Sequence, residues 1–149
     1  MLIGQLAKQA GCDTETIRYY EREELLQKPS RTASGYRSYT AWHLEQLNFV
    51  LHCRSLGMTL TDIKALQNFQ AEPNLACKEI NTLLDQHIAR IHQKIHAMYL
   101  LEKQLIALRD CCHDNLTVRE CGILKTLVSA SKGGGCVCYH DTSLGAAPS

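Results

Sequence analysis

Long apolar runs, an export signal and a strong net charge are all missing from this 149-residue sequence. No stretch of about 18 or more apolar residues occurs, so no segment can cross a bilayer as a helix. The N-terminus lacks the charged-then-apolar pattern of a secretion signal, and we expect a cytoplasmic protein without membrane partners. The formal net charge of +1 does not indicate nucleic acid, so any claim about DNA must rest on where the charges lie.

Motifs of enzymes and of iron–sulfur proteins are absent as well. No nucleophile–base set and no cofactor-binding loop can be found, so enzyme activity is not expected. An iron–sulfur cluster needs four closely grouped cysteines, and no such group follows the long helix described below. The chain nevertheless has eight cysteines, at positions 12, 53, 77, 111, 112, 121, 136 and 138. Structural disulfides are rare in a reducing compartment, so metal binding or redox chemistry is the expected use.

Two short helices joined by a tight turn are predicted at the N-terminus. Residues 2–10 have a helical pattern that stops at Gly11, and Asp13 or Thr14 can cap a second helix that continues to Leu25. This pair is typical of a helix-turn-helix. Residues 29–39 combine Pro, Ser and Gly with aromatic and basic residues, which predicts a loop or hairpin that we call the wing. Five basic residues lie in this region against three glutamates: Arg18, Arg22, Lys28, Arg31 and Arg37 against Glu21, Glu23 and Glu24.

Two further helices are predicted before residue 75. Thr40 opens a helix that Gly57 ends, and Thr59 with Asp62 fits a capping box at the start of the next. Pro73 closes this helical region.

A long helix is predicted from Lys78 to Arg109, where no Pro or Gly interrupts the sequence. Its apolar residues recur at intervals of three or four over about five heptads, as in coiled coils. They are Ile80, Leu84, Ile88, Ile91, Ile95, Met98, Leu101, Leu105 and Leu108. Nothing else in the chain is large enough to cover this stripe, so we expect a two-chain coiled coil. The alternative is a helix packed within one chain.

Three segments together resemble the signature of the MerR family: Ile3-Gly4-Gln5-Leu6-Ala7, Thr16-Ile17-Arg18-Tyr19-Tyr20-Glu21 and Gly35-Tyr36-Arg37-Ser38-Tyr39. The resemblance continues through Cys53-Arg54-Ser55-Leu56-Gly57-Met58 and the long helix, to about residue 128. It implies a mainly α fold in four parts. These are a winged helix-turn-helix domain at 1–75, an antiparallel coiled-coil dimerisation helix at 76–111, a metal-binding loop with a short helix at 112–128, and a flexible cysteine-containing tail at 129–149.

The resemblance also implies which residues contact DNA. A recognition helix in the major groove needs side chains that donate to phosphates and base edges. In this sequence these are Arg18 and Tyr19 on the second helix, whereas Tyr20 is expected to pack inward. The wing residues implied to contact DNA are Tyr36 and Arg37, with Arg31 and Tyr39 as further candidates.

A metal site that spans two chains follows from the length of the long helix. Cys77 and Cys112 bracket it, and 35 helical residues would hold them about 52 Å apart. One chain cannot bring both to one ion. If two such helices pair antiparallel, however, Cys77 of the partner subunit meets Cys112, and the loop 113–120 is long enough to add Cys121. This set of three thiolates resembles the ligands of family members that sense divalent soft metals.

The identity of the metal is narrowed by sulfur chemistry and by the resemblance. Thiolates favour soft or borderline ions. Relatives that sense monovalent copper or silver typically carry Ser where this chain has Cys77. Two thiolates around a monocation leave about the same residual charge as three around a dication, so Cys77 argues for a divalent ion. Cys121-Gly-Ile-Leu, the Cys77–Cys112 spacing and the Cys136-Val-Cys138 tail most resemble the branch that responds to Cd(II) and Pb(II). Cys111, Cys112 and His113 also resemble the Zn(II) branch, whose further loop histidine is missing here, so Zn(II) is second and Hg(II) third.

The other thiols have weaker assignments. Cys111 and His113 are candidates for an auxiliary role at the metal, and Cys111 equally fits the end of the coil. Cys136, Cys138 and His140 follow three glycines and form either an auxiliary metal-binding arm or a tail with incidental thiols. Cys12 and Cys53 fit structural positions in the helical region.

The resemblance implies a metal-sensing transcription regulator. As a homodimer it would bind a palindromic operator in double-stranded promoter DNA and distort that DNA for RNA polymerase when metal binds. The expected targets are genes for metal efflux or resistance. A thiol-rich metal-buffering protein is the alternative from another class, but it would leave Arg18, Tyr19 and the wing without a purpose.

Overall fold

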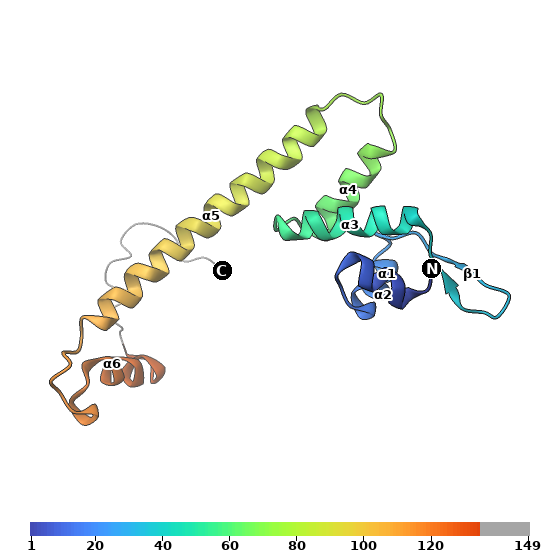
Figure 1. Cartoon of the computed structure of the whole chain (residues 1–149). Coiled ribbons are helices and arrows are strands. Elements are labelled where there is room, and N and C mark those ends of the chain that lie inside the picture. The colour runs from blue at the N-terminus through green and yellow to red at the C-terminus, as the bar shows by residue number, and fades with distance from the viewer. Residues whose placement is uncertain (135–149) are drawn as a thin grey trace. The chain divides into compact units, whose positions relative to one another are not determined.

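A computed structural model describes residues 1–134, so Cys136, Cys138 and His140 lie outside the described residues. It confirms the predicted mainly α fold (Figure 1). The chain divides into two compact units, Met1–Asp85 and a second from Gln86 onward. In chain order the elements are α1 (Ile3–Ala10), α2 (Thr14–Arg22), β1 (Ser30–Arg31), β2 (Arg37–Ser38), α3 (Ala41–Ser55), α4 (Leu60–Gln70), α5 (Lys78–Arg109), the 3-10 helix η1 (Val118–Glu120) and α6 (Gly122–Ser131).

The turn between α1 and α2 forms as the sequence predicts. Gly11 ends α1 in the left-handed conformation, with φ of 70°, which glycine adopts without a steric penalty. Two residues later, the Asp13 carboxylate accepts a hydrogen bond of 2.6 Å from the backbone N–H of Thr16 and so caps α2. The stop and start signals are therefore adjacent, which makes the helix-turn-helix compact.

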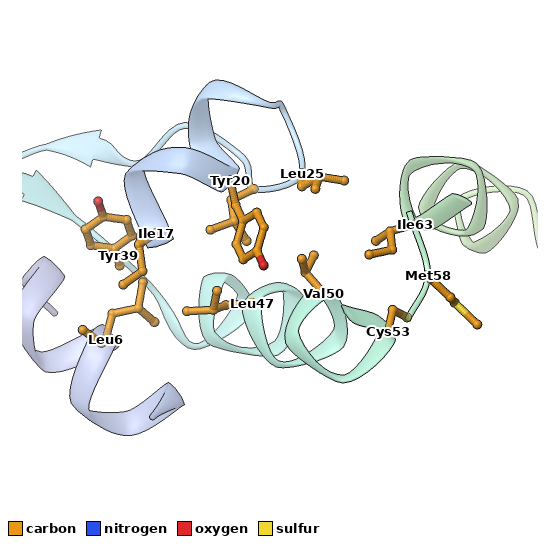
Figure 2. Packing of buried hydrophobic residues seen from close by; sticks show 12 residues of the cluster. Leu6, Ile17, Tyr20, Leu25, Tyr39, Leu47, Val50, Cys53, Met58 and Ile63 are labelled. Atoms are coloured by element: carbon orange, nitrogen blue, oxygen red, sulfur yellow. The ribbon is translucent and has the colours of Figure 1, made fainter. Parts of the chain in front are cut away.

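The core of the first unit is built from α1, α2, α3 and α4 (Figure 2). Leu6, Ile17 and Leu47 are fully buried where the first three of these helices meet, and Figure 2 shows Tyr39 beside Ile17. Burial of each such aliphatic side chain contributes about 1.5–3 kcal/mol. Tyr20 is buried as predicted. This core fixes α2 and therefore the direction of its exposed side chains.

The wing is a short antiparallel hairpin, as predicted, with Ser30 opposite Ser38 and Arg31 opposite Arg37. Its turn closes through a 2.8 Å hydrogen bond from Thr32 N–H to the Tyr36 carbonyl. The capping box predicted at the start of α4 is also present, since Asp62 N–H donates to Thr59 Oγ1 at 3.1 Å.

Helix α5 has the predicted limits and is about 48 Å long by its 32 residues. Leu84, near its start, packs against the core of the first unit. Further along, the side chains of Ile91, Ile95, Met98, Leu101, Leu105 and Ile106 are exposed in the single chain. An apolar helix face of this kind needs a partner in water. None of the helices within residues 1–134 is both long enough and apolar enough to cross a membrane.

Candidate functional site

The exposed side of α2 carries the first predicted DNA contacts. The side chain of Arg18 is about half exposed and pairs with Glu15 one turn earlier. Tyr19 is 39% exposed, and the Arg22 guanidinium lies 5.7 Å from the centre of its ring. Both predicted residues are therefore accessible to a ligand on this face of α2.

A basic cavity of about 420 Å³ lies between α2 and the wing. All five cationic residues of this cavity belong to the basic cluster noted in the sequence, but Arg22 and Lys28 were not predicted to contact DNA. Their closeness in sequence to Arg18 and Arg31 was the signal that could have identified them. The cavity is lined by Arg18, Glu21, Arg22, Lys28, Pro29, Arg31 and Arg37. With five cationic groups and one carboxylate, it suits a phosphate backbone.

Tyr39 requires a correction. The sequence placed it among the DNA contacts, but it is only 2% exposed, and its hydroxyl donates a 2.6 Å hydrogen bond to Glu21 Oε1. A side chain this buried has no surface to offer to DNA, so the prediction of a direct contact is wrong. Tyr36, in contrast, is 67% exposed in the wing turn.

Two thiols meet in the second unit, at the loop that joins α5 to α6. Cys121 is the N-cap of α6, and the pKa of its thiol is lowered mainly by the nearby Leu124 backbone N–H and then by the Cys112 side chain. The neighbouring Cys121 side chain raises the pKa of the Cys112 thiol, and that thiol donates a 3.4 Å hydrogen bond to the His113 carbonyl. A helix N-terminus stabilises an anion in this way. The two sulfur groups therefore lie side by side, with the Cys121 thiol easier to deprotonate than the Cys112 thiol.

Gly122 allows this loop to return to the end of α5. A Cβ atom built at Gly122 would overlap the backbone carbonyl oxygen of Cys111, so the two segments approach more closely than a side chain would permit. The start of the loop is held by Arg109, which donates to the Cys112 carbonyl at 2.9 Å and to Asp114 at 3.1 Å. These contacts place Cys112 opposite Cys121.

The other predicted ligands within residues 1–134 do not complete a metal site with this pair. Cys77 is exposed and directly precedes α5, whereas Cys112 follows its last turn. Within residues 1–134, no group of three or more His, Cys, Asp or Glu side chains is arranged to hold a metal ion. His113 is exposed, and the Cys111 thiol donates to the Ala107 carbonyl. Within the described residues of one chain, two of the three predicted thiols therefore come together.

The two remaining thiols within residues 1–134, those of Cys12 and Cys53, support the structure, as predicted. Cys53 is buried in the core, and Cys12 is half-buried and packs against it. Burial raises the pKa of both thiols and keeps them protonated.

The helix-turn-helix, the wing and the long helix define a DNA-binding protein of the winged-helix class. Two family models match the chain: "MerR HTH family regulatory protein" over residues 1–70 and "MerR, DNA binding" over residues 44–108. The chain belongs to the MerR family, so it is a DNA-binding transcription regulator and not an enzyme.

Relatives of this chain include the HTH-type transcriptional regulator ZntR homolog of Haemophilus influenzae, which is 43% identical over 110 residues, 74% of this chain and 82% of the relative. Among solved structures, the regulator PbrR691 from Ralstonia metallidurans in complex with lead(II) is 43% identical, with a TM-score of 0.75 over 85% of this chain and 99% of the other. A dual-function MerR regulator from Bacillus megaterium in complex with mercury(II) is 31% identical, with a TM-score of 0.66 over 86% and 99%.

Proposed function

We propose that this chain is a metal-sensing transcription regulator that acts as a homodimer on promoter DNA. The observation that supports this most is the Cys112–Cys121 pair, which is held by α6 and Gly122. Two thiols in contact are a soft donor set, which fits Cd(II), Pb(II), Hg(II) or Zn(II) and not Mg(II) or Ca(II). The pair is incomplete for a three-thiolate site.

The third ligand in this proposal is Cys77 of the partner subunit. The exposed apolar face of α5 needs a second helix to cover it, and an identical helix in antiparallel orientation is the simplest partner. In that arrangement the residue before one α5 lies beside the residues after the other. Cys111 and His113 stand next to this site and are proposed as auxiliary groups.

Among the metals, we favour Cd(II) or Pb(II), with Zn(II) and then Hg(II) as alternatives. The lead(II) complex of the R. metallidurans regulator, at 43% identity, supports the first choice. The names of the H. influenzae relative and of the mercury(II)-bound regulator keep the other two open.

The regulatory mechanism rests on ligands that come from two subunits. Such a site favours the dimer arrangement in which Cys77 approaches the partner's Cys112 and Cys121, and the α5 pair passes this bias to the two DNA-binding units. We propose that the metal-free dimer holds a palindromic operator unproductive and that the loaded dimer distorts it for RNA polymerase. The proposed targets are genes for metal efflux or resistance, and the proposed location of the regulator is the cytoplasm.

Complementation between two inactive variants tests the shared site. Cys77→Ser and Cys112→Ser homodimers should each lose the metal response and keep operator binding, because neither change touches the first unit's core. In a mixed dimer, Cys77 of the Cys112→Ser chain meets an intact Cys112–Cys121 pair, so one complete site re-forms. Co-expression with different affinity tags and metal titration of the purified mixed dimer measures this. Failure of the mixed dimer to regain one site would contradict ligand sharing.

Transcription in vitro from the cognate promoter tests the metal. Cd(II), Pb(II), Zn(II), Hg(II) and Cu(I) are added separately at buffered free concentrations. We expect the strongest activation with Cd(II) or Pb(II), and activation by Zn(II) alone would overturn that choice. A metal buffer without gene control would bind metal but show no activation at all, and would leave the basic cavity beside α2 without a use.

A further inference from the structure

Glu21 is the one carboxylate that lines the basic cavity between α2 and the wing. Its side chain is only 10% exposed, although it lies in the same cavity as five cationic residues. An acidic group here opposes the binding of phosphate, because it cancels one of the five positive charges. A second, favourable role would explain why Glu21 lies in this cavity.

The contacts of Glu21 join three segments of the first unit. Oε1 accepts a 2.6 Å hydrogen bond from the Tyr39 hydroxyl, and Oε2 lies 3.5 Å from Nε of Arg37. Glu21 belongs to the last turn of α2, Arg37 to β2, and Tyr39 to the segment that leads from the wing into the core. One carboxylate thus ties the recognition helix to the wing.

We propose that Glu21 is a positioning residue that holds Arg37 and the wing in the orientation needed to grip an operator phosphate. This inference rests on the proposed contact of the wing with DNA. The ion pair between Nε and one carboxylate oxygen restricts the movement of the Arg37 guanidinium, while its terminal N–H groups can still donate to a phosphate. A preoriented guanidinium loses less side-chain entropy when DNA binds.

Tyr39 holds the Glu21 carboxylate in place. Its ring is buried in the core, so the hydroxyl sits at a fixed point from which it donates to Glu21. Burial, and after it the bond to Glu21, raises the pKa of Tyr39 above its usual range. The hydroxyl therefore remains a hydrogen-bond donor throughout the physiological pH range.

The two roles of Glu21 predict opposite results for Glu21→Gln. If the carboxylate acted only through its charge, the neutral amide would strengthen binding to any DNA, because one repulsive group is gone. If it positions Arg37, binding to the operator weakens although the cavity has become more positive. Loss of the charge-assisted hydrogen bond from Arg37 to the operator phosphate would lower operator affinity roughly 10-fold.

Fluorescence anisotropy of the full-length dimer on operator and on unrelated duplex DNA, at several salt concentrations, tests the proposal. We expect Glu21→Gln to bind the operator about 10-fold more weakly and unrelated DNA no more weakly than wild type, so the specificity ratio falls. Glu23→Gln, an exposed carboxylate at the end of α2, is the matched control and should match wild type. Equal or tighter operator binding by Glu21→Gln would overturn the proposal.

A double-mutant cycle with Arg37→Gln separates positioning from general destabilisation. In the Arg37→Gln background, Glu21→Gln should change operator affinity by less than about 2-fold, because residues that act through one another are not additive. An undiminished effect there would refute the role assigned to Glu21. If Arg37→Gln alone bound the operator like wild type, the wing contact itself would fail, and this proposal with it.

A variant on the surface keeps the test decisive if Glu21→Gln does not fold. Arg37 is about half exposed, so Arg37→Lys should leave the melting temperature unchanged. Lysine keeps the charge but lacks the fork that binds carboxylate and phosphate at once. We expect operator affinity to fall with a nearly unchanged salt dependence, and wild-type affinity for this variant would contradict the proposal.

Discussion

At the scale of single residues, the candidate metal site depends on a hydrogen atom in place of a side chain. Gly122 follows Cys121 and lies against the Cys111 carbonyl, where any Cβ would overlap the oxygen. The sequence motif Cys121-Gly-Ile-Leu contained this glycine, but nothing in the sequence showed what it approaches. The contact partner is eleven residues earlier, just after the end of α5.

Gly122→Ala should push α6 away from the end of α5 and separate Cys121 from Cys112. We expect soft-metal affinity to fall by about 10- to 100-fold, the usual effect of removing support around metal ligands, with operator binding unchanged. Competition titration with a chromogenic chelator measures this. Gly4→Ala is the control, because a Cβ at Gly4 has nothing within 4 Å. Unaltered metal affinity in Gly122→Ala would show that the close approach is not required.

At the scale of the elements, local signals in the sequence were sufficient for most helix boundaries. Gly11, Asp13, Thr59 and the uninterrupted run from Lys78 to Arg109 each act on neighbouring backbone, and the structure confirms them. Two boundaries differ: α2 ends at Arg22 rather than continuing to Leu25, and α6 extends to Ser131 rather than ending near 128. The end of α6 was missed because the sequence has no strong stop signal before Gly133.

The exposed face of α5 makes a prediction about assembly. Ile95 is 63% exposed in the single chain, and in the proposed antiparallel pair it would be buried. Ile95→Glu should therefore weaken the dimer strongly, because an unpaired carboxylate costs several kcal/mol to bury. Gln93→Glu, exposed and outside the apolar face, is the matched control. Sedimentation equilibrium measures the association constant, and an unchanged dimer in Ile95→Glu would exclude this face as the interface.

At the scale of the whole molecule, the described residues include the candidate sites for DNA binding and for metal binding. The basic cavity lies in the first unit and the Cys112–Cys121 pair in the second. Cys136, Cys138 and His140, predicted as an auxiliary arm or an incidental tail, lie outside them. Their contribution can be separated experimentally from that of the main site.

Removal of residues 135–149 should leave operator affinity and the high-affinity metal site intact, since Cys77, Cys112 and Cys121 all remain. Metal stoichiometry by mass spectrometry under native conditions is the readout. One metal per predicted site in both proteins would assign the thiols of the tail no role in binding. A lower stoichiometry or affinity in the truncated protein would instead establish the auxiliary arm.

The sequence by itself determined the helices, their caps, the wing and the family, because these depend on periodicity and on residues a few positions apart. It also predicted which cysteines are structural. Tertiary structure alone decided that Tyr39 faces the core, that Arg22 and Lys28 join the basic cavity, and that Glu21 ties α2 to the wing. These facts depend on side chains that meet across different elements, and such meetings are set by packing, which local sequence does not encode.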